Sequence, residues 1–309
     1  MICGHGHAAL TCASVPITTS FGTNSSFTYA SNAQNIISGS GLTCSGGSIL
    51  SIGAAEHFDA IINLPSTNGT LRLTNSTTND YIPYTIHCPT QEVACVTTSS
   101  ASMQTFSWNY STTDLLGLLK GPDKTLPVYM QTATNINVPA GIYTDTLTIN
   151  WNYNLCDGIG INLGITLCTK PVTGKISSTI TVTATVTNDC YIDNAPDVNF
   201  GSAPLPAQFQ TINSALSVRC TKNASYKVNM TSSNPAKGDW RQMQDITGQH
   251  TLLYQLYRSD NTLWTNTNDL SQMGNGESQP INYIARINPA QENLPAGIYS
   301  DKVIVTVTY

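Results

Sequence analysis

Apolar and polar residues alternate with a period of two in several short segments, most clearly at the C-terminal end of the chain. Val303, Val305 and Val307 alternate there with Thr306 and Thr308. This alternation is typical of a β-strand with one buried face, because successive side chains of a strand point to opposite faces of its sheet. Gly and Pro interrupt the chain often, and no long apolar period of 3.6 residues occurs. The pattern predicts an all-β protein made of sandwiches of short strands.

The C-terminal segment has a copy in the middle of the chain. Residues 139–153 read PAGIYTDTLTINWNY and residues 295–309 read PAGIYSDKVIVTVTY, with seven of fifteen positions identical. A second set of landmarks precedes each copy in the same order. These landmarks are Cys12, Phe21-Gly22 and Cys44 in the first copy, and Cys190, Phe200-Gly201 and Cys220 in the second. The repeat indicates two copies of one domain, and we assign residues 1–175 to the first and residues 176–309 to the second.

Residues 176–187 (ISSTITVTATVT) alternate for twelve residues, about twice the length of an ordinary strand. We expect the first half to complete the sheet of the first domain and the second half to begin the second domain. The second domain has no equivalent segment, because the sequence stops at Tyr309. We therefore expect it to lack a closing strand and to accept one from another chain. The accepting edge would carry Val303, Val305 and Val307.

The composition excludes several classes of protein. Only 10% of the residues are charged, and 13 Lys and Arg against 18 Asp and Glu cannot form a basic nucleic-acid-binding stripe. The 40% of apolar residues are enough to bury a core, which argues against disorder. Nine cysteines at this low charge favour an oxidising compartment outside the cytoplasm. No apolar run approaches about 18 residues, and the first ten residues do not resemble a signal peptide, so an exported chain would be a mature form.

The cysteines can be paired in several ways, and the sequence leaves the connectivity open. The preferred disulfides are Cys12–Cys44, Cys88–Cys95, Cys156–Cys168 and Cys190–Cys220. This pairing leaves Cys3 free or paired with another molecule. Cys3 lies with His5 and His7 in the motif CGHGH. The motif could bind copper or zinc, but a flexible terminus explains it more simply, so we expect no metal and no cofactor. The common catalytic motifs are absent from the sequence, and we expect no enzymatic activity.

The repeated motifs resemble those of the spore coat protein U domain. The resemblance rests on the Cys…Phe-Gly…Cys opening, on the closing Pro-Ala-Gly-x-Tyr-x-Asp motif with its alternating strand, and on residues 253–257 (LYQLY) followed by Trp264. That domain builds archaic chaperone–usher pili of the Csu type. The resemblance implies two immunoglobulin-like β-sandwich domains, of which the C-terminal one is incomplete.

The resemblance also implies partners. In this family, the missing strand comes first from a periplasmic chaperone and then from the N-terminal extension of the next pilus subunit, after passage through an outer-membrane usher. This chain has two domains, and its residues 1–9 lack the alternation of a donor strand. A subunit that accepts a strand but donates none belongs at the extracellular tip of a pilus. The chain is thus similar to the two-domain tip adhesins of this family, and a minor structural subunit is the alternative.

Apolar segments of the first domain have no counterpart in the second. They combine large apolar side chains with Gly or with paired cysteines, which suggests exposed loops that adhere to a hydrophobic or host surface and support biofilm formation. The predicted contact residues are Val93, Leu115, Leu116, Gly117, Leu118, Leu119, Ile159, Gly160, Ile161, Leu163 and Ile165. The alternative is that these segments are buried, since the apolar residues from Ile159 to Ile165 also alternate as a core strand does.

A carbohydrate-binding lectin is a second possible class of adhesin. Trp108, Tyr110, Trp151 and Tyr153 could form aromatic platforms for sugars. However, Trp151 and Tyr153 alternate within the strand of the first closing motif, which favours a place in the core.

Overall fold

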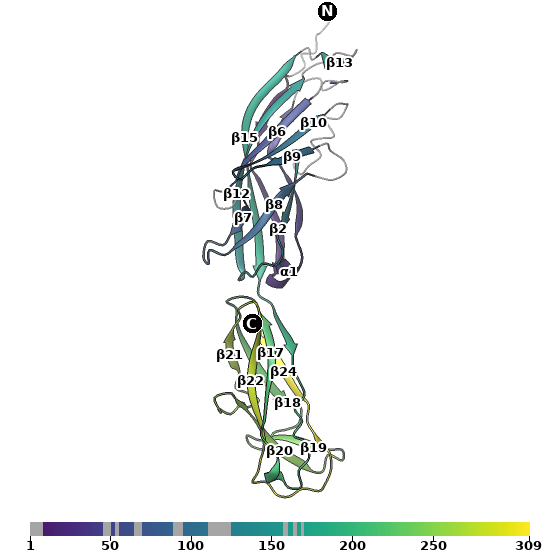
Figure 1. The fold of residues 1–309 in the computed structure, drawn as a ribbon, viewed down its shortest axis with the longest axis vertical. Helices are drawn as coiled ribbons and strands as arrows, with labels where there is room; N and C mark the ends of the chain where they lie inside the picture. The colour runs from purple at the N-terminus through teal and green to yellow at the C-terminus, as the bar shows by residue number, and fades with distance from the viewer. Residues whose placement is uncertain are drawn as a thin grey trace, which may run out of the picture. The chain divides into compact units, whose positions relative to one another are not determined.

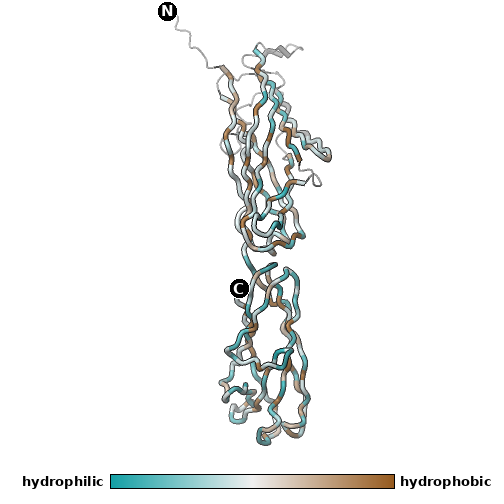
Figure 2. Tube along the Cα trace, turned by 90° about the vertical axis from the view of Figure 1, so that its left-hand side faces the viewer, coloured by the Kyte–Doolittle hydropathy of each residue, from teal (hydrophilic) through white to brown (hydrophobic). Residues whose placement is uncertain are grey.

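The computed structural model describes residues 9–45, 51–52, 56–64, 70–88, 95–110, 125–156, 160–162, 166–167 and 170–309. The chain divides into two compact units (Figure 1). Unit 1 comprises Met1–Ile136 and Gly141–Thr187, and unit 2 comprises Asn137–Ala140 and Asn188–Tyr309. Both units are built almost entirely of β-strands, as the period-two alternation predicts, and Figure 2 shows apolar and polar positions interleaved along both. No helix among the described residues is long and apolar enough to cross a membrane.

The described part of unit 1 contains one short helix, α1 (Ser26–Ser31), whose first turn is capped by the Ser25 side chain. Its strands are β1 (Thr11–Ser14), β2 (Ile17–Ser25), β3 (Asn35–Gly39), β4 (Leu42–Ser45), β5 (Ser51–Ile52), β6 (Glu56–Asn63), β7 (Leu71–Thr74), β8 (Tyr81–His87), β9 (Cys95–Ser99), β10 (Met103–Tyr110), β11 (Pro127–Thr132), β12 (Gly141–Cys156), β13 (Gly160–Asn162), β14 (Thr166–Leu167) and β15 (Pro171–Thr187).

The main strands of unit 1 form a two-layered sandwich. One layer has the order β3-β11-β8-β7, and the other has the order β9-β10-β6-β12-β15-β2. A single paired position, Thr144 opposite Thr74, joins β12 to β7 between the layers. Across the sandwich, the rings of Phe21 and Tyr84 meet edge to face with centroids 6.0 Å apart. The core of unit 1 therefore lies between these two layers.

Strand β15 closes this sandwich along its whole length. It pairs antiparallel with β12 from Pro171 to Val186, and it pairs parallel with β2 from Ile180 to Thr187. Its inward side chains Ile180, Val182 and Ala184 have no exposed surface. The structure thus corrects our expectation that the second half of this segment begins the second domain. Unit 2 starts at Asn188 rather than at residue 176, because the apolar residues of that half are buried in unit 1.

Unit 2 has the same topology as unit 1 without a counterpart of β15. Its strands are β16 (Cys190–Asn194), β17 (Ile212–Cys220), β18 (Ser225–Ser232), β19 (Arg241–Asp245), β20 (Thr251–Arg258), β21 (Leu270–Met273), β22 (Ser278–Ile287), β23 (Tyr299–Ser300) and β24 (Val303–Thr308), with a single 3₁₀ turn, η2 (Pro206–Gln208). One sheet has the order β16-β17-β22-β20-β19-β23, and the other has the order β21-β18-β24.

The correspondence between the units follows the repeat found in the sequence. Strand β12 pairs with β6 as β24 pairs with β18, and β7 pairs with β8 as β19 pairs with β20. In each unit a disulfide joins the first strand to a strand beyond the Phe-Gly landmark, β1 to β4 in unit 1 and β16 to β17 in unit 2. The predicted pairs Cys12–Cys44 and Cys190–Cys220 are both confirmed. The two units are therefore copies of one fold that differ at the position of the closing strand.

Candidate functional site: an open groove in unit 2

Strand β24 lies at the edge of its sheet. On one side it pairs antiparallel with β18, with Val305 opposite Met230 and Val303 opposite Ser232. On its other side, no described strand pairs with it. In unit 1, the equivalent side of β12 pairs with β15. The predicted accepting residues Val303, Val305 and Val307 thus lie on a strand whose free edge corresponds to the closed edge of unit 1.

The missing strand leaves apolar side chains of this edge partly uncovered. In unit 1, Leu147 and Ile149 of β12 are 3% and 1% exposed. Their counterparts Val303 and Val305 are only partly buried, although both pack against the core of unit 2. Since the sequence patterns of the two segments agree, the neighbouring strand alone accounts for the difference in burial.

A groove of about 320 Å³ runs along the free edge. One rim is the closing segment, and the other is the irregular segment that follows β16 and takes the place of β2. The rim residues are Tyr299, Ser300, Asp301, Val303 and Val305 on the first side, and Ala195, Pro196, Asp197, Val198 and Phe200 on the second. The floor is formed by Leu216, Met230, Met243, Tyr254, Leu256, Tyr283 and Ala285. In unit 1, β15 occupies the space between the two equivalent rims.

In both copies, a tyrosine hydroxyl donates a hydrogen bond to the Asp of the closing motif, and the Phe of the Phe-Gly motif packs against the ring of that tyrosine. The Tyr254 hydroxyl donates to Asp301 Oδ2 at 2.5 Å, and the Phe200 ring contacts the Tyr254 ring with centroids 6.3 Å apart. In unit 1, Tyr84 donates to Asp145 at 2.8 Å. Burial, reinforced by the nearby carboxylate, raises the pKa of Tyr254 far above its ordinary value, so the hydroxyl remains a donor. The recurring Phe and Asp therefore hold the two rims of the groove onto the same tyrosine.

Two further side chains donate to this carboxylate in unit 2, whereas Asp145 in unit 1 has a further donor in the backbone N–H of Thr146. The Ser232 hydroxyl also donates to Asp301 Oδ2, and Asn234 Nδ2 donates to Oδ1 at 3.0 Å. The position of Ser232 is occupied by Leu64 in unit 1, as the equivalent registers of β6 and β18 show. Asp301 is thereby fixed at the rim by three neutral donors while the adjacent strand is missing.

Arg241 is a buried cation behind the groove. Its side chain is 2% exposed, and Nη2 donates to the backbone oxygens of Met230 and Trp264 at 2.7 and 2.9 Å. Burial lowers the pKa of this guanidinium, and the nearby Asp301 carboxylate counteracts the shift. Leu71 occupies the equivalent place in unit 1, opposite Tyr84. In unit 2, Arg241 links a strand of one sheet to the backbone of the other, which helps to hold the two sheets around the open groove.

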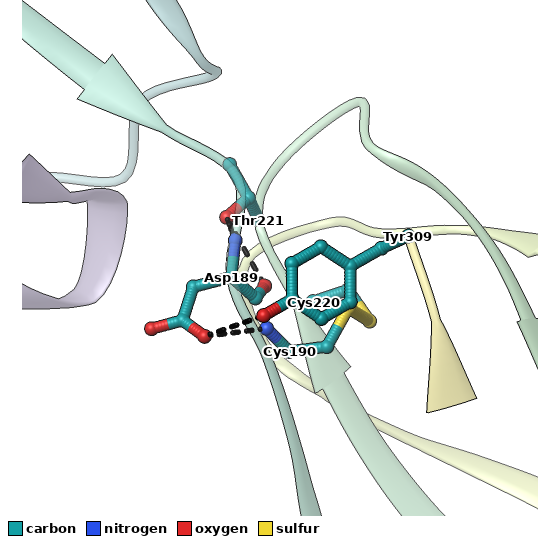
Figure 3. Close-up of a disulfide and its surroundings, with 5 residues drawn as sticks. All are labelled: Asp189, Cys190, Cys220, Thr221 and Tyr309. Carbon is teal, nitrogen blue, oxygen red and sulfur yellow. Dashed lines mark hydrogen bonds between the residues drawn. A yellow bond between two sulfur atoms is a disulfide. The ribbon is translucent and has the colours of Figure 1, made fainter. Parts of the chain in front are cut away.

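The C-terminal end of the closing segment is held beside the disulfide. Figure 3 shows the Tyr309 hydroxyl directed at the Asp189 carboxylate, beside Cys190–Cys220, with an Oη–Oδ1 distance of 3.3 Å. The counterpart of Tyr309 in unit 1 is Tyr153, which packs so closely on Gly174 of β15 that a Cβ on this glycine would clash with its hydroxyl. The part of the closing segment that lines the groove comprises residues 299–301, 303 and 305.

Most of the predicted contact residues of unit 1 lie outside the described part of the chain. These are Val93, Leu115, Leu116, Gly117, Leu118, Leu119, Ile159, Leu163 and Ile165. Gly160 and Ile161 belong to β13, and their side chains are not among those described. Cys3, His5, His7 and Cys168 also fall outside. Cys88 is disulfide-bonded, and the pairings Cys88–Cys95 and Cys156–Cys168 stay predictions.

The aromatic residues considered as a sugar platform include two core tryptophans. Trp108 and Trp151 are 4% and 0% exposed, and their rings lie 5.7 Å apart. The Trp151 indole donates to Ser178 Oγ, and that hydroxyl donates to the Ser40 carbonyl. Neither indole is available to stack on a sugar at the surface.

Sequence reasoning missed the second rim and the polar groups of the groove. Nothing in the sequence showed that residues 195–200 face residues 299–305, because this juxtaposition depends on the sandwich. The recurrence of the Phe-Gly motif and the segment 253–257 were the available signals, since they contain Phe200 and Tyr254. The buried Arg241 carried no signal at all in a single sequence.

Solved structures include proteins that resemble this chain. A chain in the crystal structure of the CsuC–CsuE chaperone–tip adhesion subunit pre-assembly complex of Acinetobacter baumannii matches with a TM-score of 0.59 and 23% identity, covering 97% of this chain and 100% of that one. The CupB6 tip adhesin of Pseudomonas aeruginosa matches with a TM-score of 0.34 and 14% identity, covering 98% and 94%. Among curated protein sequences, none matches.

The model of the Spore Coat Protein U domain matches the chain twice, at residues 6–150 and 176–306. The second match begins inside β15, whereas the compact unit begins at Asn188, because a sequence model follows the repeat and the compact unit follows strand pairing. The two matches cover most of the chain, include both disulfides and include both rims of the groove. The chain therefore belongs to the Spore Coat Protein U domain family.

Proposed function

We propose that this protein is the tip adhesin of a chaperone–usher pilus. Unit 2 accepts a strand that attaches the subunit to the fibre, and unit 1 contacts the target surface. The observation that carries the proposal is the groove of unit 2, which corresponds in place and in rim residues to the space that β15 fills in unit 1. The resemblance of the fold to a tip subunit crystallised with its chaperone supports the same assignment.

The register of β15 indicates which strand the groove takes. In unit 1, Ile180 lies opposite Leu147, Val182 opposite Asp145 and Ala184 opposite Tyr143. The repeat places Val303, Asp301 and Tyr299 at those three positions of unit 2. The accepted strand would therefore run antiparallel to β24. It would place a large aliphatic residue opposite Val303 and a small residue opposite Tyr299.

A peptide of residues 176–187 tests strand acceptance. We expect it to bind the full-length chain and to raise the melting temperature of unit 2, because a ligand that binds only the folded state stabilises that state. A control peptide with Asn at the positions of Ile180 and Val182 should have no effect, since it cannot fill the apolar groove. Binding that persists when Val305 of the chain is replaced by Asp would place the peptide elsewhere and contradict the proposal.

The partners and the location follow from this role. A periplasmic chaperone would occupy the groove first, the outer-membrane usher would export the complex, and the next pilus subunit would then supply the permanent strand. The protein would act at the cell surface, at the pilus tip. It needs no cofactor and no catalysis, because adhesion requires only a stable attachment and a contact surface.

Adhesion itself would come from the apolar segments of unit 1, through burial of Leu and Ile side chains against a hydrophobic or host surface, and it would support biofilm formation. Each buried side chain contributes about 1.5–3 kcal/mol before ordering losses. Replacing Leu116, Leu118, Ile159 and Ile161 with Ser should abolish attachment to plastic while pili still assemble. Unchanged attachment, or attachment that free sugars inhibit, would contradict this mode of binding.

A further inference from the structure

Unit 2 has three exposed apolar side chains on segments that continue from residues lining the groove or from the strands beside it. Ile246 and Ile298 are 101% and 87% exposed, and Leu205 is 42% exposed. Asp245 pairs with Tyr299, so Ile246 and Ile298 are the next residues along two neighbouring strands. Tyr299 and Ser300, which follow Ile298, already belong to the rim of the groove. Ile246 and Ile298 therefore adjoin the groove, and we call these two side chains and Leu205 the apolar end patch of unit 2.

The counterparts in unit 1 show that two of these positions are apolar only in unit 2. Leu205 precedes η2 as Ser25 precedes α1, but Ser25 caps its helix and Leu205 makes no side-chain cap. Ile246 corresponds to Ser76, since the turns that follow β19 and β7 close through equivalent bonds from Asp245 and Asn75. Only Ile298 has an apolar counterpart, Ile142. An isoleucine and a leucine on the surface of unit 2 have no role in its own core.

The direction of β15 indicates what would cover the patch. Thr185 of β15 lies opposite Ile142, and Thr187, its last residue, lies opposite Ser25. The chain leaves unit 1 at this point and continues into the next domain at Asn188. A donor strand that lies in unit 2 in the same direction would likewise pass Ile298 and end beside Leu205. Whatever folded domain follows that strand in the donor must then begin at the patch.

We propose that Leu205, Ile246 and Ile298 form a docking surface for the folded body of the strand-donating subunit, separate from the groove that binds its strand. This inference rests on the proposed function. The patch needs no charged partner, because the neighbouring Asp245 carboxylate already accepts hydrogen bonds from Thr247, Gln249 and His250. The donor surface it fits is apolar and lies immediately after the donor strand, and the contact would fix the orientation of the first joint of the fibre.

The test compares two probes on the full-length chain. One probe is the single-domain subunit that follows this chain in the fibre, purified with its N-terminal extension, and the other is a synthetic peptide of that extension alone. In the variant with Leu205→Ser, Ile246→Ser and Ile298→Ser, we expect the whole subunit to dissociate at least about tenfold faster, and the peptide to dissociate at the wild-type rate. Ile142→Ser, at the equivalent place in unit 1, is the matched control and should change neither rate.

The outcomes separate this inference from the proposed function. Equal dissociation of the whole subunit from the variant and the wild type would overturn the docking surface while leaving strand acceptance intact. An equal effect on both probes would also overturn it, because the residues would then act through the groove. Failure of the wild-type chain to bind either probe would overturn the proposed function and, with it, the docking surface. Since all three residues are exposed, the melting temperature of the free variant should match that of the wild type.

Discussion

The two units have the same topology and differ by one strand. In unit 1, β15 lies between β12 and β2, and the inward side chains Leu147 and Ile149 are buried. In unit 2, no described strand takes this place, and the equivalent Val303 and Val305 are partly exposed. The comparison shows that the pattern of a strand decides which face is apolar, whereas the neighbouring strand decides whether that face is covered.

The units also differ in the chemistry behind the open edge. Unit 2 has Arg241 and Ser232 where unit 1 has Leu71 and Leu64. These polar side chains bind backbone oxygens and the Asp301 carboxylate. A sandwich that is closed by its own strand needs only apolar packing at these places. The open sandwich instead has hydrogen bonds that fix Asp301 at one rim and link its two sheets.

Supplying the missing strand should have the largest effect. Residues 171–187, appended after Tyr309 through a short Gly/Ser linker, should fill the groove and stabilise unit 2 by about 5 kcal/mol, because several apolar side chains become buried. Calorimetry would show the transition of unit 2 at higher temperature, and the peptide of residues 176–187 would no longer bind. An appended strand with Asn at the positions of Ile180 and Val182 is the control. An unchanged transition would mean that the groove is not the place of a missing strand.

The converse change is Val182→Asp in β15. Val182 has no exposed surface, so the carboxylate would be buried without a partner and unit 1 should lose about 4 kcal/mol. The denaturation transition of unit 1 would shift, while that of unit 2 would not. Thr181→Asp, on the outward side of the same strand, should have little effect. A shift of both transitions would show that β15 also supports unit 2.

The disulfides provide a comparison in which both units should respond alike. Cys12–Cys44 and Cys190–Cys220 span 32 and 30 residues. Loop-closure entropy predicts that replacing either pair with Ala costs about 3.5 kcal/mol. Denaturant titration of each double variant checks this value. A much smaller loss in unit 2 would indicate that its open groove already allows the rims to separate.

The smallest expected difference concerns the paired tyrosines. Tyr84→Phe should cost unit 1 about 2 kcal/mol, because Asp145 loses its side-chain donor from the opposite sheet and keeps the local backbone N–H of Thr146. Tyr254→Phe should cost unit 2 only about 1 kcal/mol, since Ser232 and Asn234 still donate to Asp301. Equal losses, measured by chemical denaturation, would contradict the role we assign to the extra donors.

Much of this fold could be predicted from local pattern. The alternation at residues 303–308 predicted the strand, and the recurring landmarks predicted the duplication and both confirmed disulfides. The free edge of unit 2 was also expected from the comparison of the two repeats, and β24 pairs with β18 alone among the described strands. The assignment of residues 183–187 to the second domain was wrong. A run of alternating residues shows that a strand exists, but it does not show which sheet the strand joins.

The sequence by itself determined the class of fold, the repeat and two disulfides, because these depend on periodicity and spacing. Only the tertiary structure decided that β15 belongs wholly to unit 1 and that Phe200 and Asp301 converge on Tyr254 from opposite rims. It also decided that Arg241 is buried and that Ile246 and Ile298 are exposed side by side. These features depend on pairing between segments far apart in the chain, and no local pattern encodes the distance between them.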